Sequence, residues 1–167
     1  MLLDYEDNKM LTKLLPDQIS KFWDIIKYAI EESLPPLAGD HPDRMNRILS
    51  ALLSSKVQCW ASYRREKNNT IFEGVCLTKL LYDDVSDTRN LLLYSVYGYE
   101  KTIEETWMEA FLAVAKYAEG LDCNRIVGYT SVPYLVEKAK LYGANTDNVF
   151  VSFDISKTSK KIVNKEI

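Results

Sequence analysis

The sequence predicts an α/β (α+β) fold in which a mixed central sheet of about six strands is flanked by four helices. Stretches with the alternating or continuous apolar residues of strands fall between stretches with the three- and four-residue apolar spacing of helices. Three strand-like stretches follow one another across short polar turns, which predicts an antiparallel meander. The third of them, Leu91–Tyr97, runs through a turn into a long helix and a further strand, the order of a parallel crossover.

Length and composition indicate one globular domain. The 167 residues are 47% hydrophobic and 27% charged, which is ordinary for a folded domain with its own core. We expect this domain to cover residues 1–155, followed by a basic C-terminal tail, 156–167. The tail has four lysines against one glutamate, a net charge of +3. Because the whole chain has a net charge of −3, the rest of it carries −6. Nucleic-acid binding is not expected, since such proteins usually carry a basic excess or stripe.

The cysteines and the apolar runs point to a cytoplasmic protein. Three cysteines, an odd number without a C-x-x-C pair, favour reduced thiols over a disulfide framework. The first residues turn acidic at once, unlike a secretory signal, and no apolar run is long enough to span a bilayer. No metal site is expected, because His41 is the only histidine. We favour a surface position for His41 over a place in a ligand loop.

The first third of the chain predicts one short strand and two helices. The strand covers residues 10–15. Pro16 then begins a helix whose apolar residues recur every three or four positions until the Pro35-Pro36 pair ends it. A second helix begins with Pro42, because proline suits the first helical position. Both helices have one apolar stripe and are expected to cover a sheet.

The meander supplies the next three strands. Val57–Arg64 and Ile71–Tyr82 are joined by a polar hairpin turn at Glu66–Asn69. Gly74 lies inside the second strand, where a glycine predicts a bulge or a close approach by another backbone. The third strand, Leu91–Tyr97, starts apolar on both faces, which is typical of a central strand covered by helices.

The rest of the chain predicts two helices, each followed by a strand. Ile103–Glu119 has the broad apolar stripe of a helix lying on a sheet, and Asn124–Thr130 is expected to pair in parallel with the third meander strand. A last helix opens at Pro133 and stops at Gly143. Val149–Ile155 alternates and predicts a final strand. The basic tail after it has little reason to be ordered unless a partner holds it.

This element order, with a glycine in the second meander strand, resembles the GNAT N-acyltransferase superfamily over residues 10–155. The family's last strand–helix unit often reads as a strand, a Ser or Asn, and a helix ending in Leu-Gly-Phe. Here Ser131 precedes a helix that ends in Leu141-Tyr142-Gly143-Ala144. The segment from Tyr97 to Ser131 also looks like small GNAT-like proteins of tailed bacteriophages. This resemblance rests on the general run of residues rather than on a mechanistic motif.

The resemblance implies an acetyl-CoA site where the third meander strand runs into its helix. In the family this strand splays from its parallel neighbour, and an Arg/Gln-x-x-Gly-x-Gly/Ala turn presents backbone N–H groups to the pyrophosphate. Carried onto this sequence, the cofactor-binding positions are Val96, Gly98, Lys101, Thr102 and Ser131.

The phosphate turn departs from the family pattern. With Lys101 in place of the Arg/Gln, the two glycine positions fall near Glu104 and Thr106. Glu100, Glu104 and Glu105 crowd the start of the helix. Each acid there stabilises the helix by about 0.3–1 kcal/mol and repels a pyrophosphate. The turn therefore favours a stable helix end over an anion site.

The family's catalytic tyrosine is also displaced. In the resemblance it lies about four residues before the glycine of Leu-Gly-Phe and acts as general acid, and that position is Ala139 here. Tyr142, three residues on and on the same helical face, is the one catalytic candidate, although a tyrosine in a last helical turn more often packs. No carboxylate is singled out as general base, because the direction of Glu73 cannot be read from the sequence.

Three functions remain open from the sequence. The first is a non-catalytic GNAT-like protein, a structural or accessory phage component in the host cytoplasm or the virion. Its tyrosine-rich strand end (Tyr94, Tyr97 and Tyr99) favours a protein partner or a homo-oligomer, although core packing explains any single tyrosine. The second is an acetyl-CoA-dependent N-acetyltransferase with a non-standard loop. The third is a binder of a CoA-type ligand without turnover. Fold alone does not decide between them.

Overall fold

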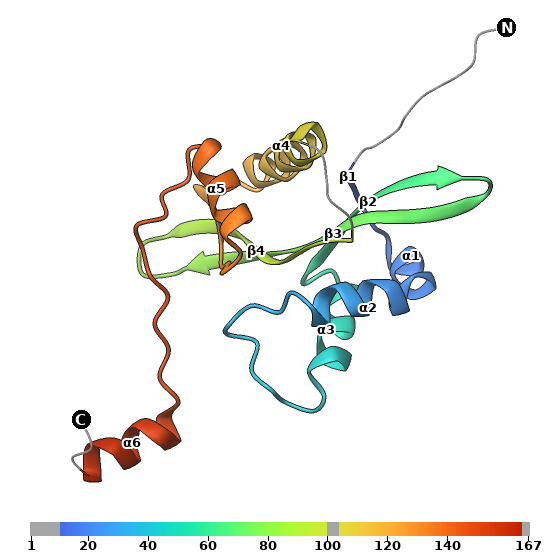
Figure 1. Ribbon diagram of the computed structural model, residues 1–167. Coiled ribbons are helices and arrows are strands. Elements are labelled where there is room, and N and C mark those ends of the chain that lie inside the picture. Colours follow the sequence, from blue (N-terminus) through green and yellow to red (C-terminus); the bar gives the residue numbers. More distant parts are fainter. Residues whose placement is uncertain (1–10, 100–103, 165–167) are drawn as a thin grey trace, which may run out of the picture. The chain divides into compact units, whose positions relative to one another are not determined.

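The computed structural model describes residues 11–99 and 104–164, which form five strands and six helices (Figure 1). The chain divides into two compact units, 1–129 and 130–167, and each is described by itself. In chain order the elements of the first unit are β1 Leu11–Lys13, α1 Pro16–Lys21, α2 Trp23–Glu31, α3 Arg44–Leu53, β2 Gln58–Glu66, β3 Asn69–Asp83, β4 Thr88–Gly98, α4 Glu104–Gly120 and β5 Arg125–Gly128. The second unit holds α5 Pro133–Leu141 and α6 Ile155–Asn164.

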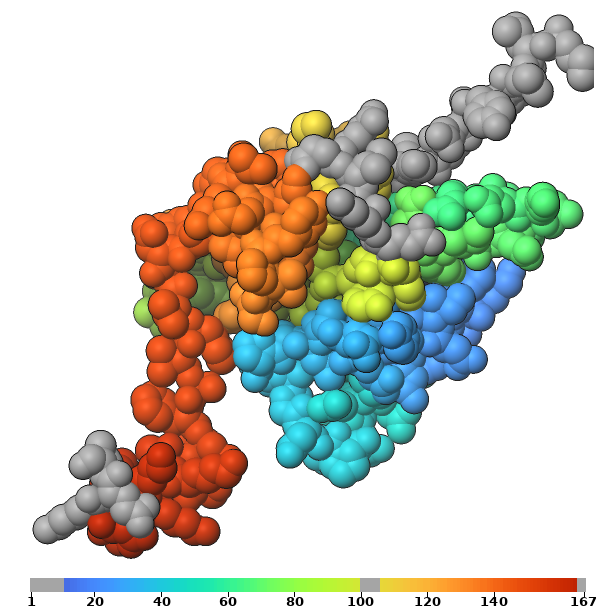
Figure 2. Space-filling model, in the orientation of Figure 1, coloured from blue at the N-terminus to red at the C-terminus, as the bar shows by residue number. Residues whose placement is uncertain are grey.

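The five strands form one mixed sheet in the order β1-β2-β3-β4-β5. β1 through β4 pair antiparallel, which confirms the meander. β5 pairs with β4 in parallel, as the crossover through a long helix predicts. All three meander strands are longer than expected. The β2–β3 hairpin (green) protrudes at one side of the space-filling view (Figure 2), and its turn residues Lys67 and Asn68 have the positive φ values, 45° and 69°, that a tight hairpin needs.

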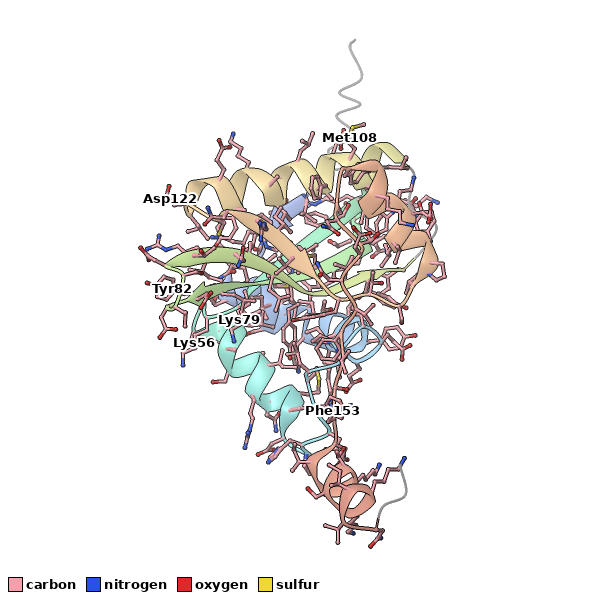
Figure 3. The ribbon with its side chains drawn as sticks, turned by 90° about the vertical axis from the view of Figure 1, so that its left-hand side faces the viewer. Lys56, Lys79, Tyr82, Met108, Asp122 and Phe153 are labelled. Carbon is pink, nitrogen blue, oxygen red and sulfur yellow. The ribbon has the colours of Figure 1, made fainter. Side chains whose placement is uncertain are left out.

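Helices cover both faces of the sheet. In the side-chain view, α4 lies on one side of the strands and α3 on the other (Figure 3). The larger apolar core lies between the sheet and α1–α3, with Ile26, Ile30 and Leu77 almost completely buried. A smaller core lies under α4, where the Trp60 and Tyr117 rings meet edge-on at 5.1 Å. Two-sided cover explains the continuous apolar run at the start of β4.

The first predicted helix is two helices in the structure. α1 ends at Lys21 and α2 begins at Trp23, with Phe22 between them at φ −106° and ψ 20°. The Phe22 ring contacts the Phe72 ring of β3 edge-on at 5.1 Å. A stripe with apolar residues three and four apart does not reveal such a break, because both halves face the same core. The second predicted helix begins at Arg44 rather than at Pro42, which lies in a turn.

The predicted final strand at Val149–Ile155 is wrong. Residues 149–154 run without pairing to any described strand, which is why the sheet has five strands rather than six. Ile155 instead begins α6, so the basic tail is helical over most of its length. Asp154 explains the start of this helix, because its Oδ1 accepts hydrogen bonds from the Ser156 hydroxyl (2.7 Å) and the Lys157 amide (3.2 Å). None of the helices described is long and apolar enough to cross a membrane.

Candidate functional site

The distinctive feature of the first unit is that β4 continues after β5 has ended. The parallel ladder runs from Asn90 opposite Arg125 to Leu93 opposite Gly128. β4 goes on for five more residues, Tyr94–Gly98, still paired with β3 on its other side. No described strand pairs with the β5 side of this stretch, which we call the β4 free edge. Unpaired backbone N–H and C=O groups of an edge are ready to bond a ligand.

A β-bulge marks the start of the β4 free edge. Leu93 lies opposite Thr78 and Ser95 lies opposite Leu77, so Tyr94 is an extra residue without a partner on β3. Bulges bend a strand, increase its twist and commonly lie next to binding sites. This bulge coincides with the last β4–β5 pair, Leu93 and Gly128. The extra residue therefore turns β4 where the two parallel strands part.

The backbone groups that face the free edge belong to Val96 and Gly98. The Tyr99 amide donates a hydrogen bond to the Glu73 carbonyl across on β3, at 3.0 Å. Successive backbone groups of an extended strand point to alternate sides. Gly98 and Val96 therefore direct their N–H and C=O groups away from β3, toward the side that β5 leaves open.

Side chains at the bulge and along the free edge divide between the two cores. Leu93 and Val96 pack with the α4 core, whereas Tyr94 and Tyr97 pack with the core under α1–α3. The buried Ser95 hydroxyl lies 2.6 Å from the Ser33 hydroxyl, next to the end of α2. The bulge thus turns two consecutive residues, Tyr94 and Ser95, to the same face of the sheet.

Three aromatic rings fix the end of β4 against α2. The Tyr97 ring meets the Tyr28 ring at 5.9 Å and the Tyr99 ring at 5.0 Å, both edge-on. The Tyr99 hydroxyl donates to the Ile25 carbonyl at 2.7 Å. Burial raises the pKa of Tyr99 to about 12, and a hydrogen bond with Tyr28 raises the pKa of Tyr97. The Tyr97 and Tyr99 phenols are therefore neutral at pH 7, and all three rings pack within the first unit.

The structure shows the direction of the Glu73 side chain, which the sequence left open. A second bulge, between Ser62 and Tyr63 of β2, leaves Glu73 as an extra residue on β3. Its Oε1 accepts from the Arg64 Nη1 at 3.1 Å, and its Oε2 lies 3.5 Å from the Ser62 hydroxyl. The next residue, Gly74, lies opposite Gly98 at the end of β4. The Glu73 backbone thus lies beside the end of the free edge while its carboxylate contacts β2, a position that the sequence did not reveal.

Gly74 meets both expectations for a glycine inside a strand. It follows the extra residue of the bulge, and it is closely approached by another backbone. A Cβ atom at Gly74 would lie 3.1 Å from the Tyr97 carbonyl oxygen. Glycine therefore lets β3 and β4 stay close beside the free edge.

The positions predicted from the resemblance fall in three parts of the chain. Val96 and Gly98 lie on the free edge. Lys101 and Thr102 lie outside the described residues, so their part in a phosphate turn stays a prediction. Ser131 and Tyr142 belong to the second unit, in which Ser131 precedes α5 and Tyr142 is half-buried at its C-terminal end. Their roles also stay predictions.

A separate hollow of about 410 Å³ lies beside the α2–α3 loop, with Lys27, Glu31 and His41 in its lining. His41 is exposed, as expected. Its Nδ1 lies 3.0 Å from the Asp43 amide and its Nε2 lies 3.3 Å from Arg47. A neutral imidazole has one acceptor nitrogen, so the two contacts are not both hydrogen bonds. Among the described residues, no three His, Cys, Asp or Glu side chains are grouped to hold a metal ion.

Three solved structures similar to this chain are described as acetyltransferases. An aminoglycoside acetyltransferase from an uncultured soil metagenomic sample, in complex with sisomicin, matches with a TM-score of 0.63 and 14% identity over 89% of this chain and 96% of its own. A predicted acetyltransferase with acetyl-CoA from Clostridium acetobutylicum matches with a TM-score of 0.61 and 15% identity, over 88% and 96%. A ribosomal-protein-alanine N-acetyltransferase from Brucella melitensis biovar Abortus 2308 matches with a TM-score of 0.60 and 14% identity, over 86% and 96%.

These likenesses establish the fold. No protein-family model and no curated protein matches the sequence. The structures named above are at most 15% identical to this chain in sequence. They therefore show its architecture and not its activity. The chain has the GNAT-like acetyltransferase fold, which confirms the fold that the element order predicted. The resemblance to phage proteins stays a prediction.

Proposed function

We propose that the chain binds an acyl-CoA thioester along the β4 free edge and transfers its acyl group to an amine. One observation carries this proposal: β4 leaves β5 at the Tyr94 bulge, so the backbone groups of Val96 and Gly98 face an edge that no described strand fills. Similar folds have been solved with acetyl-CoA and with CoA, which supports a ligand of this class.

The residues on the free edge suit the pantetheine arm of such a ligand. That arm carries two amides, which bond to a strand edge as a neighbouring strand does. Val96 and Gly98 supply the backbone donors and acceptors, and the Val96 side chain adds apolar contact on the α4 side. When bound, the thioester would supply the activated acyl group.

Glu73 is a carboxylate on β3, the strand paired with the end of β4. An amine must lose a proton to become a stable amide, and a carboxylate within reach is a suitable acceptor. Glu73 is largely buried, with its side chain 12% exposed, and Arg64 holds it in position. We assign it the proton-accepting role.

The experiment is a calorimetric titration with acetyl-CoA and CoA, followed by an assay of thiol release with a panel of amines. We expect a Kd of about 1–100 µM for acetyl-CoA. Val96→Pro removes one free-edge N–H, whereas the matched control Val96→Ala keeps it. Val96→Pro is expected to weaken binding about tenfold or more, which corresponds to about 1.4 kcal/mol, and Val96→Ala is expected to weaken it less. A folded chain that binds neither acetyl-CoA nor CoA would overturn the proposal.

A second candidate is protein interaction without acyl transfer, as expected for a structural or accessory phage protein. The sequence feature that favours it is the acidic run before and into α4, in which Glu100, Glu104 and Glu105 stand in place of a glycine-rich phosphate turn. Binding of CoA without thiol release in the amine panel would support the third reading, a CoA-type ligand binder. Absence of binding, together with a stable partner complex, would support the interaction protein.

A further inference from the structure

The α2 side of the β4 free edge carries two tyrosine rings at right angles to each other. Tyr28 of α2 and Tyr97 of β4 meet edge-on, with ring centroids 5.9 Å apart and planes at 88°. We call this pair the aromatic corner. Tyr97 stands between Val96 and Gly98 in the free edge, and Tyr28 is 51% exposed. Aromatic rings that meet in this way form the walls of the cages in which proteins bind organic ammonium ions.

Contacts within the first unit hold the aromatic corner in place. The Tyr99 ring packs edge-on against the Tyr97 ring at 5.0 Å, and the Tyr99 hydroxyl donates to the Ile25 carbonyl at 2.7 Å. The Ser33 and Ser95 hydroxyls, 2.6 Å apart, join the end of α2 to the same part of β4. Side chains that are already positioned lose little conformational freedom when a ligand binds. The aromatic corner is therefore preorganised for a ligand.

Acidic residues stand at the end of α2, next to the aromatic corner. α2 ends at Glu31, Glu32 caps it, and its last turn holds no basic residue. Because a helix C-terminus already carries partial negative charge, stability alone would favour a lysine or an arginine there.

Glu32 lies one turn after Tyr28 on the same face of α2. A hydrogen bond with Tyr28 and, as a smaller cause, the charge of Glu32 raise the pKa of Tyr97. Glu31 has a partner in Lys27, at 3.9 Å, whereas Glu32 directs its charge toward the two rings. Aromatic rings beside a carboxylate at the negative end of a helix attract a cation.

A cation at the aromatic corner restricts the chemistry of the acceptor. The nitrogen that attacks a thioester has to be uncharged, because its lone pair forms the new N–C bond. An ammonium ion held at the corner is therefore a different nitrogen from the one that reacts.

We propose, on the basis of the acyl transfer proposed above, that the acceptor is a diamine or a polyamine. One ammonium ion of this acceptor lies at the aromatic corner beside Glu32, and a second, uncharged amine reaches the thioester on the free edge. In the transfer step the N–C bond forms, the C–S bond breaks, the proton that the nitrogen loses passes to Glu73, and the sulfur leaves as a thiolate.

The first test is a calorimetric titration of the full chain with putrescine in the absence of acetyl-CoA. We expect a Kd of about 1 mM or tighter, which rises with salt because charge contributes to binding. Tyr28→Ala is expected to weaken binding about fivefold or more, whereas Tyr28→Phe, which keeps the ring, is expected to weaken it less than about twofold. Glu32→Gln is also expected to weaken binding about fivefold or more. The matched control Glu119→Gln removes an exposed carboxylate near the end of α4 and is expected to leave the Kd unchanged.

Turnover tests the need for a second nitrogen. Butylamine has the carbon chain of putrescine and lacks one of its two amines. We expect kcat/KM for thiol release from acetyl-CoA to be about tenfold or more higher with putrescine than with butylamine. Glu32→Gln should bring the two values close together without changing the Kd for acetyl-CoA.

The outcomes separate this inference from the proposed acyl transfer. Equal turnover of the two amines, or putrescine binding that Tyr28→Ala and Glu32→Gln leave unchanged, would overturn the diamine acceptor and leave acyl transfer standing. A folded chain that binds putrescine but neither acetyl-CoA nor CoA would overturn acyl transfer, and the acceptor role of the diamine with it.

Discussion

The hydroxyls of Ser33 and Ser95 lie 2.6 Å apart and join the end of α2 to the bulged part of β4. The Ser33 hydroxyl also lies 2.6 Å from the Ala29 carbonyl, to which it donates its only proton. Ser95 must therefore be the donor in the pair, because a hydroxyl has a single proton. This chain of two hydrogen bonds satisfies a buried polar group beside the proposed acyl-CoA edge.

Ser95→Ala is expected to lower the free energy of unfolding by about 1 kcal/mol, the usual net value of a buried hydrogen bond. Urea denaturation of the variant against the wild type measures this loss. Ser33→Ala and the double variant complete a cycle, and the coupling between the two sites should be about 0.5–1.5 kcal/mol. Strictly additive losses would show that the two hydroxyls do not interact.

Gly74→Ala tests the close approach of β3 and β4. Its Cβ would lie 3.1 Å from the Tyr97 carbonyl oxygen, so the two backbones have to separate slightly. We expect a loss of about 1 kcal/mol in the free energy of unfolding, and a larger loss for Gly74→Val. Gly120→Ala is the matched control, because no atom lies within 4 Å of the Cβ that it adds. That control should be neutral or stabilising by up to about 1 kcal/mol. Equal effects at the two glycines would contradict the prediction.

Stability is expected to fall steeply in alkaline solution. Burial raises the pKa values of the Cys59 and Cys76 thiols from 9.0 to about 12, and that of Tyr99 from 10.0 to about 12. The unfolded chain releases these protons first, so their contribution is complete below pH 9 and is lost between pH 9 and 12. Each group contributes a slope of up to about 1.4 kcal/mol per pH unit within its range.

Urea unfolding at several pH values between 7 and 11 measures this slope. Cys76→Ala should reduce it, whereas Cys123→Ala, which removes a thiol of intermediate exposure, should change it less. A flat profile from pH 9 to 11 would show that these thiols and Tyr99 ionise as readily in the folded chain as in the unfolded one.

Glu73→Gln separates positioning from proton transfer. Arg64 keeps a second partner, because its Nε lies 3.2 Å from Glu66, so the loss of stability should be about 1 kcal/mol or less. If Glu73 accepts the amine proton, kcat for acyl transfer should fall by about 10²-fold or more while the Kd for acetyl-CoA is unchanged.

Glu66→Gln is the matched control for Glu73→Gln. It removes a carboxylate from the same arginine, but Glu66 lies at the tip of the β2–β3 hairpin. This variant should keep its kcat. A similar fall in both variants would assign the effect to Arg64 rather than to proton transfer at Glu73.

The sequence predicted the meander, the parallel crossover and the GNAT-like architecture because each depends on apolar spacing and turn residues. It did not predict the break at Phe22, since both halves of the helix present one continuous stripe to the core. The final strand was predicted incorrectly because alternation at Val149–Ile155 reports a side-chain pattern, whereas a strand also requires a neighbour. The overlooked signal for a helix start was Asp154, whose carboxylate accepts a hydrogen bond from the Lys157 amide in the first turn of α6.

The candidate site was predictable in part. Val96 and Gly98 were named from the family resemblance, and the structure places their backbone groups on the β4 free edge. The Tyr94 bulge could not be read from the sequence, because an extra residue in a strand changes the pairing without changing the composition. The direction of Glu73 depends on Arg64, nine positions earlier and on another strand, which no local pattern reports.

The Tyr94 bulge also inverts the parity of β4. Before it, the odd-numbered residues Leu91 and Leu93 face α4, and after it the even-numbered Val96 does. Deletion of Tyr94 would restore strict alternation and leave Leu93, Ser95 and Val96 on their present faces, but it would remove the bulge at the point where β4 parts from β5. One inserted residue thus gives β4 two registers. The first is set by its parallel neighbour β5, and the second by whatever fills the space beyond the end of β5.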